Sequence, residues 1–124
     1  MLSVDGQRAA YLALHGLAHE VADGRWVATG GGGYALVEVV PRAWTHLLSV
    51  VSGRPLVPDT AVPESWRTHV RDTLGHTAPQ LMTDGVEPAY RDWEEGYDPA
   101  NWLDRSILAT REEIFPRHGL DPLP

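Results

Sequence analysis

The sequence contains no cysteine, which excludes disulfide bonds, thiolate zinc sites and a catalytic thiol. It has no apolar run long enough to span a bilayer, and residues Met1 to Arg8 hold no basic segment followed by a hydrophobic stretch. Basic residues are also scarce, since 10 of them stand against 17 acidic residues and the formal charge is -7. We therefore expect a cytoplasmic protein that binds neither nucleic acid nor a membrane.

The residues that are present are typical of a globular protein. Hydrophobic residues make up 43% and charged residues 22% of the 124 residues. This composition argues against wholesale disorder. The length suggests one domain or a piece of one.

Hydrophobic periodicity predicts an amphipathic helix near the start of the chain, from about Val4 to Val21. Asp23 and Gly24 should end this helix, because a glycine after the last periodic residue is a common helix stop. The apolar face, which the pattern marks for burial, holds Ala10, Leu14, Leu17 and Val21.

Three further helices are predicted. The first starts near Val37 to Val40, because Pro41 lacks an amide donor and belongs in the first turn, and it ends at Gly53. The others are expected over Glu64–Leu74 and Asn101–Phe115, with an irregular stretch between them. The apolar face of the helix that begins near Val40 holds Leu36, Val39, Val40, Ala43, Leu47 and Val50, and Arg42 falls opposite.

Residues Arg25–Thr29 are β-prone and almost uncharged, which is typical of a buried strand. Helix, strand, glycine-rich loop and helix then follow one another, the order found in α/β proteins with a parallel sheet flanked by helices. A single strand cannot form a sheet, so its neighbours would have to come from elsewhere. We therefore predict an α/β fold that is incomplete as a folding unit.

Four glycines, Gly30 to Gly33, lie between the predicted strand and Tyr34. Ligands of parallel α/β proteins gather where the strands end, and glycine lets the backbone approach them closely. The Tyr34 hydroxyl could there donate a hydrogen bond to an oxygen that becomes negative. For a glycine run alone, a flexible turn with a surface tyrosine is the commoner structure. A dinucleotide site is disfavoured, because Ser49–Leu56 holds no acidic residue.

Two strings, Trp26–Tyr34, which ends in four glycines and a tyrosine, and Val40–Thr45, which contains Arg42, Trp44 and Thr45, stand close together in the sequence. Together they resemble the C-terminal signature of the histone deacetylase superfamily. There a strand leads into Gly-Gly-Gly-Gly-Tyr, and Arg-x-Trp-Thr follows on the next helix. The resemblance points to the bacterial acetoin-utilization branch. The residues that carry it are Trp26–Tyr34 and Val40–Thr45, with Arg42, Trp44 and Thr45, and more weakly Trp93, Asp98–Pro99, Thr110 and Phe115–Pro116.

The resemblance implies the arginase-deacetylase fold, a parallel sheet flanked by helices, and hydrolysis of an acetyl-lysine amide. In that chemistry a zinc ion held by two Asp and one His activates water, two adjacent His residues handle protons, and a Tyr helps to polarise the acetyl carbonyl. Only the tyrosine maps onto this chain, as the catalytic residue Tyr34. Gly31, Gly32 and Gly33 would bind the substrate together with Tyr34, and no metal ligand maps here.

It follows from the resemblance that residues 1–124 are the C-terminal segment of a single deacetylase domain, inactive alone. Its partners would be the upstream half of the same enzyme and a substrate that is an acetylated lysine or acetylated amine. Zinc would be bound in the complete enzyme and not by this segment alone. The alternative, from the residues themselves, is a non-catalytic α/β module that binds an anion or a partner at its glycine-rich loop.

Two histidines, His15 and His19, are four residues apart and share a helix face, a spacing that suits a metal pair. A third ligand and the Glu of an H-E-x-x-H helix are missing, so a solvated polar face is favoured. Arg42 is expected to contribute a structural salt bridge in the parent enzyme and to have no catalytic role. The other histidines, including His46, are expected to be structural or exposed.

Overall fold

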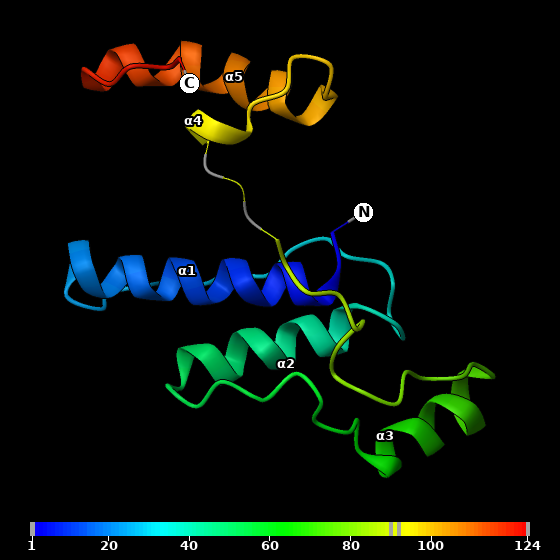
Figure 1. Cartoon of the computed structure of the whole chain (residues 1–124). Coiled ribbons are helices and arrows are strands. Elements are labelled where there is room, and N and C mark those ends of the chain that lie inside the picture. Colours follow the sequence, from blue (N-terminus) through cyan, green and yellow to red (C-terminus); the bar gives the residue numbers. More distant parts are fainter. Residues whose placement is uncertain (1, 90, 92, 124) are drawn as a thin grey trace. The chain divides into compact units, whose positions relative to one another are not determined.

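The computed structural model describes residues 2–89, 91 and 93–123 of the chain (Figure 1). It divides into two compact units, Met1–Pro88 and Ala89–Pro124, which are described separately. The first unit contains helices α1 (Val4–Ala22), α2 (Val40–Val51) and α3 (Glu64–His69), with a π-helical continuation of α3 over Val70–Leu74. The second contains α4 (Trp93–Gly96), α5 (Trp102–Ile114) and a 3₁₀ turn over Phe115–His118.

Helix α1 begins at a side-chain cap and ends at a left-handed backbone turn. The Ser3 hydroxyl accepts a hydrogen bond from the Gly6 N–H at 3.0 Å, and a cap of this kind contributes about 1 kcal/mol. At the other end Asp23 and Gly24 adopt left-handed backbone angles, with φ of 53° and 74°. The predicted span of this helix and its stop signal are therefore confirmed.

Helix α2 packs beside α1 in the first unit (Figure 1). It carries Pro41 in its first turn, as predicted, and Gly53 lies just past its end with φ of 70°. Ala43 and Val50 of the predicted apolar face are buried. Leu36, which was assigned to the same face, is 64% exposed, so that part of the prediction is wrong.

The segment that leads into α3 pairs with the segment that follows this helix. An isolated antiparallel bridge joins Ala61 to Leu81, with the Val62 N–H donating to the Gln80 carbonyl at 2.8 Å. The predicted helix over Glu64–Leu74 is confirmed in extent, although its last turn is π-helical. A small apolar cluster stabilises this region and consists of Val37, Val70 and Ala78 with Trp66 against them.

The second unit is organised around α5. The Asn101 side chain caps the start of α5, where it accepts a hydrogen bond from the Leu103 N–H at 3.0 Å. This agrees with the predicted helix that begins at Asn101. The Arg111 guanidinium lies 4.7 Å from the Trp93 ring centroid and 4.5 Å from that of Phe115. This cation–π arrangement ties the short helix α4, which fell in a stretch predicted to be irregular, to α5.

The predicted α/β fold is wrong for this chain. Residues Arg25–Thr29 form no strand, and the part of the chain that the structure describes contains only helices and one isolated bridge. The described residues therefore contain no parallel sheet flanked by helices, and the expected arginase-deacetylase architecture is missing from them. A strand is stable only when its N–H and C=O groups pair with a neighbour, and none of the described segments pairs with Arg25–Thr29.

The prediction that the apolar face of α1 is buried is also wrong. Leu14 and Leu17 are each 50% exposed and Val21 is 73% exposed. Burial on α1 falls instead on Val4, Asp5 and Ala18. The helical period identifies an apolar face but not what covers it, and the described residues leave this face open.

Candidate functional site

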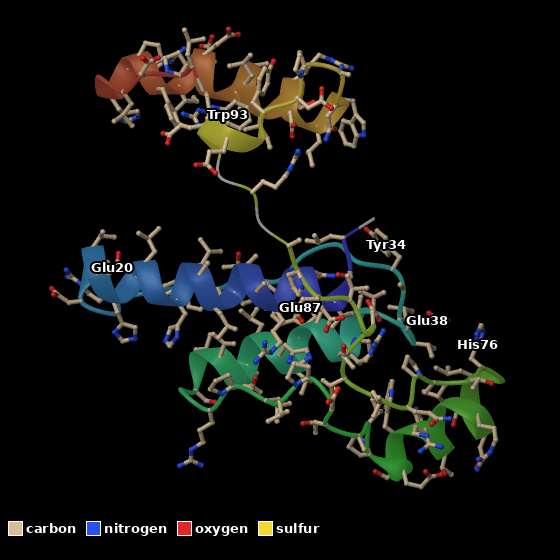
Figure 2. All side chains as sticks on the ribbon, in the orientation of Figure 1. Glu20, Tyr34, Glu38, His76, Glu87 and Trp93 are labelled. Carbon is tan, nitrogen blue, oxygen red and sulfur yellow. The ribbon has the colours of Figure 1, made fainter. Side chains whose placement is uncertain are left out.

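A cavity of about 490 Å³ in the first unit brings the predicted site residues together. Gly31, Gly32, Gly33 and Tyr34 line it from the loop that joins α1 to α2. Tyr34 is 90% exposed, so its hydroxyl is open to a solute (Figure 2). Helices α1 and α2 supply much of the remaining wall, through Gln7, Tyr11, Val40, Ala43, Trp44 and Leu47.

The loop requires glycine at positions where α2 lies against it. A Cβ atom on Gly30 would stand 2.5 Å from the Trp44 ring, which is closer than real Cβ atoms approach. Gly33 has φ of 84°, and a Cβ there would lie 3.0 Å from a Val40 methyl group. A Cβ on Gly31 would meet open space. The glycine run is therefore packed on α2 at its two ends and free between them.

The turn after Tyr34 is also held in place. The N–H groups of Val39 and Val40 both donate to the Ala35 carbonyl, at 3.2 and 3.0 Å. Val37 is buried in the apolar cluster with Val70. Because these two amides are already used within the turn, they are not open donors for a negative ion. Neither of these two amides therefore contributes to an anion site at the start of α2.

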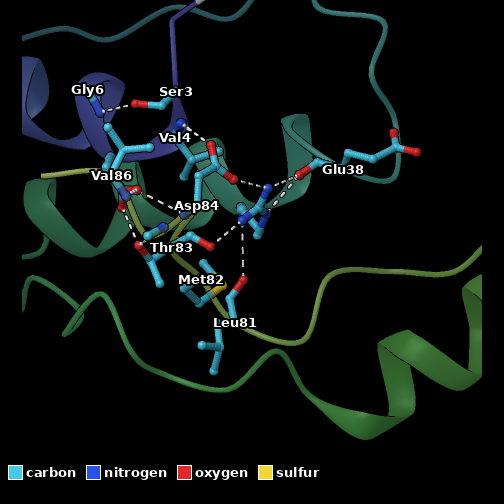
Figure 3. A network of polar contacts seen from close by, with 12 residues as sticks. Ser3, Val4, Gly6, Glu38, Leu81, Met82, Thr83, Asp84 and Val86 are labelled. Carbon is cyan, nitrogen blue, oxygen red and sulfur yellow. Dashed lines mark hydrogen bonds and ion pairs between the residues drawn. The ribbon is translucent and has the colours of Figure 1, made fainter. Parts of the chain in front are cut away.

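Arg42 is buried, with 6% of its surface exposed, and joins this turn to a distant segment, whose residues Thr83 and Asp84 are labelled in Figure 3. Its Nε donates to the Glu38 carbonyl at 2.8 Å, and its Nη1 donates to the Thr83 carbonyl at 2.9 Å. Its Nη2 forms an ion pair with Asp84 Oδ1 at 2.7 Å. The predicted structural salt bridge of Arg42 is confirmed, although the residue is buried rather than on the exposed side of the helix.

The same network reaches the start of α1. Asp84 Oδ2 accepts from the Val4 N–H at 2.8 Å. The Asp5 carboxylate accepts from the Thr83 hydroxyl and from the N–H groups of Asp84 and Val86, at 2.8, 2.9 and 3.1 Å. Burial would raise the pKa of Asp5, but these hydrogen bonds and the charge of nearby His46 together lower it below its ordinary value.

Sequence reasoning did not identify Asp5, Thr83 or Asp84. The signals that were available are the acidic residue in the first turn of α1 and the Asp-Gly pair at Asp84–Gly85, which is typical of a turn. Neither signal shows that the two carboxylates lie together, because nearly 80 residues separate them in the chain.

His46 is fully buried and structural, which agrees with one of the two predicted outcomes. Its Nε2 lies 2.9 Å from the Met82 carbonyl oxygen. A carbonyl oxygen only accepts, so Nε2 carries the hydrogen. Among the described residues, Nδ1 has no hydrogen-bond partner. His46 thus ties α2 to the segment that also binds Arg42.

The histidine pair on α1 comes together in space. His15 Nε2 and His19 Nε2 are 3.2 Å apart, and the Trp26 ring lies 5.9 Å from the His15 ring. No group of three or more His, Cys, Asp or Glu side chains able to hold a metal ion occurs in residues 2–89, 91 and 93–123. The cavity beside Tyr34 likewise has none of these residue types in its lining. The described residues therefore do not fit a zinc centre.

No helix in the described part of the chain is both long and apolar enough to cross a membrane.

Comparison with known proteins supports the sequence resemblance. The chain matches no protein-family model and no solved structure. It is 42% identical over 102 residues to the acetoin utilization protein AcuC of Bacillus subtilis, a match that covers 80% of this chain and 26% of that protein. It is 36% identical over 72 residues to the AcuC protein of Staphylococcus xylosus, covering 57% and 18%. The chain thus spans about a quarter or less of the length of these relatives.

Proposed function

We propose, from the close sequence relationship of this chain to AcuC proteins and through them to the histone deacetylase superfamily, that it is the C-terminal segment of a zinc-dependent acetyl-lysine deacetylase. Its contribution is the Tyr34 hydroxyl. The observation that carries this proposal is that Tyr34 and the three glycines before it line one cavity, with the phenol open to solvent.

Hydrolysis of an acetyl amide places negative charge on the acetyl oxygen as water adds to the carbonyl carbon. A phenol fixed beside that oxygen donates a hydrogen bond that strengthens as the charge grows, which lowers the barrier. Tyr34 is the group of this chain assigned to that role. The bare backbone of Gly31 leaves room for a substrate to approach, because nothing lies within 4 Å of the place a side chain would take.

The cavity walls agree with an acetylated lysine or a related acetylated amine. Val40, Ala43 and Leu47 supply apolar surface beside the loop. Such surface suits the aliphatic stem and the acetyl methyl group, because both are uncharged and their removal from water lowers the free energy. An acetylated amine therefore needs a hydrogen bond only at its amide end.

The rest of the machinery lies outside this chain in our proposal. The described residues do not fit a zinc centre, so zinc and the proton-handling histidines belong to the upstream half of the same enzyme. Two observations support a larger assembly. The matched parts make up only 26% and 18% of the two AcuC relatives, and Leu17, Val21 and Leu48 are at least half exposed.

The test is a chimera in which this chain replaces the matching segment of the Bacillus subtilis AcuC protein. Tyr34→Phe keeps the ring and should lower turnover of an acetyl-lysine peptide by about 10²–10³, or roughly 2.7–4 kcal/mol, while zinc content stays unchanged. Tyr97→Phe, in the second unit, is the matched control and should leave turnover unaltered. Full turnover in Tyr34→Phe would refute the catalytic role, and loss of zinc would make Tyr34 structural.

A further inference from the structure

We propose that Arg42 is a positioning residue for Tyr34: its guanidinium holds the turn that follows Tyr34, and the effect of the phenol on the reaction depends on that hold. This inference rests on the proposed function of Tyr34. It assigns a role to the arginine of the Arg-x-Trp-Thr motif that touches neither the substrate nor the reacting atoms.

Tyr34 has little means of fixing its own position. Its side chain is 90% exposed, and it follows a run of four glycines. A phenol in such a place can be held only through the backbone on either side of it. Upstream, the packing of Gly30 on Trp44 and of Gly33 on Val40 supplies this hold. Downstream, the Ala35 carbonyl accepts from the Val39 and Val40 N–H groups, Val37 is buried in the apolar cluster, and Arg42 binds the Glu38 carbonyl. Of these contacts, only the one made by Arg42 connects the turn to the segment around Thr83 and Asp84 by hydrogen bonds.

The guanidinium is tightly constrained. Nε and Nη2 both donate to the Glu38 carbonyl, and Nη1 donates to the carbonyls of Leu81 and Thr83 at 3.3 and 2.9 Å. Nη2 also donates to Asp84 Oδ1. Figure 3 labels Glu38, Leu81, Thr83 and Asp84, the residues that accept these hydrogen bonds. All three nitrogens of the planar guanidinium thus donate in fixed directions, and Arg42 as a residue is 6% exposed.

The segment that binds the guanidinium on the side away from Glu38 is itself anchored to α1. Asp84 uses its second oxygen to accept from the Val4 N–H of α1, and Asp5 holds the N–H groups of Asp84 and Val86. A movement of the turn after Tyr34 would therefore have to break bonds that reach α1. Arg42 connects the turn to a rigid frame rather than to a mobile loop.

Lysine cannot reproduce this connection. The ammonium of Arg42→Lys keeps the positive charge for Asp84, but a single nitrogen cannot reach Asp84, Thr83 and Glu38 at once in the directions of the fork. The turn would lose its bond at Glu38 and the phenol would shift. A misplacement of about 1 Å in a catalytic group costs up to about 10²-fold in rate. We expect Arg42→Lys to lower kcat by about 10-fold to 10²-fold with little change in KM.

A double-mutant cycle in the AcuC chimera separates positioning from a merely structural role. If Arg42 acts through Tyr34, Arg42→Lys should have almost no further effect on kcat in a Tyr34→Phe background. If the two losses multiply, the inference is wrong although the function of Tyr34 stands. If Tyr34→Phe alone changes nothing, the proposed function itself fails. Arg8→Lys, at another half-buried arginine that binds the Leu56 carbonyl, should leave kcat unchanged in both backgrounds.

A second measurement on the 124-residue chain does not depend on activity. In Arg42→Lys, the amides of Val39 and Val40, which close the turn on the Ala35 carbonyl, should exchange with solvent at least 10-fold faster. Asp84→Asn, which leaves a single acceptor oxygen for the two donors of Arg42 and Val4, should show the same increase and serves if Arg42→Lys does not fold. Unchanged exchange at these amides in both variants would overturn the inference.

Discussion

Replacing Gly30 with alanine tests how the glycine-rich loop lies on α2. The added Cβ would stand 2.5 Å from Trp44 Cζ2 and 2.6 Å from Cη2. Carbon atoms in contact normally lie about 3.5–4.0 Å apart, so the loop and the ring must separate by about 1 Å. Overpacking of this kind costs typically about 1–3 kcal/mol. We expect a cost in the lower part of that range, because Trp44 is 43% exposed and its ring can move outward.

The assay is urea unfolding followed by tryptophan fluorescence. Gly30→Ala should lower the midpoint by an amount that corresponds to about 1–2 kcal/mol, with the slope unchanged, because a change in stability alone shifts only the midpoint. The same variant should lower turnover in the AcuC chimera, since the loop that carries Tyr34 is displaced.

Gly31→Ala is the matched control, since it makes the same chemical change one residue away. No atom lies within 4 Å of its added Cβ, and its backbone is outside the left-handed region. Its effect on the free energy of unfolding should stay within about 0.5 kcal/mol, as for an ordinary surface substitution. Equal losses for Gly30→Ala and Gly31→Ala would refute the packing of the loop on Trp44.

Three further outcomes are expected. The 124-residue chain alone should show neither stoichiometric zinc by calorimetry nor hydrolysis of an acetyl-lysine peptide, and zinc binding with turnover would contradict the assignment of the zinc centre to the upstream half. Because the pKa of Asp5 is lowered in the folded state, its stabilising contribution is present above the unfolded pKa of about 3.9 and disappears as the pH falls through the lower folded value. Asp5→Asn should lower the free energy of unfolding by about 1–3 kcal/mol at pH 7 and should flatten the loss of stability in that acid window. A series of urea titrations between pH 6 and pH 2 would measure both effects. Leu17→Ser and Val21→Ser should change the free energy of unfolding of the chain by less than about 0.5 kcal/mol, because both side chains are at least half exposed. The same substitutions should weaken co-purification with the upstream part of the AcuC protein. Unimpaired co-purification would show that this face of α1 does not bind the upstream part.

Helix positions were predictable because the interactions that set them are local. Helical hydrogen bonds join residues four apart, and a stop such as Asp23–Gly24 or a start at Pro41 depends on one or two backbone conformations. The strand over Arg25–Thr29 was not predictable in the same way. Its residues favour a strand, but strand formation depends on a partner segment, and the described residues provide none.

Burial followed the sequence only in part, for the same reason. The pattern of α2 correctly marked Ala43 and Val50, which meet the rest of the first unit. It also placed Arg42 opposite the apolar face, where a guanidinium should be solvated. The structure buries that side chain because Glu38, Thr83 and Asp84 satisfy it there. The apolar residues of α1 at 14, 17 and 21 remain exposed, since a helical period does not determine which segment covers it.

The sequence by itself determined the two motifs, Gly30–Tyr34 and Arg-x-Trp-Thr, and through them the relationship to AcuC proteins. Only the tertiary structure determines how the two motifs contact each other and a distant segment of the chain. Trp44 packs on Gly30 before the tyrosine, while Arg42 binds Glu38 after it and reaches Asp84, 42 residues away. Contacts between residues so distant in sequence leave no periodic trace in the chain, because they depend on how the helices and the connecting segments pack rather than on any local backbone preference.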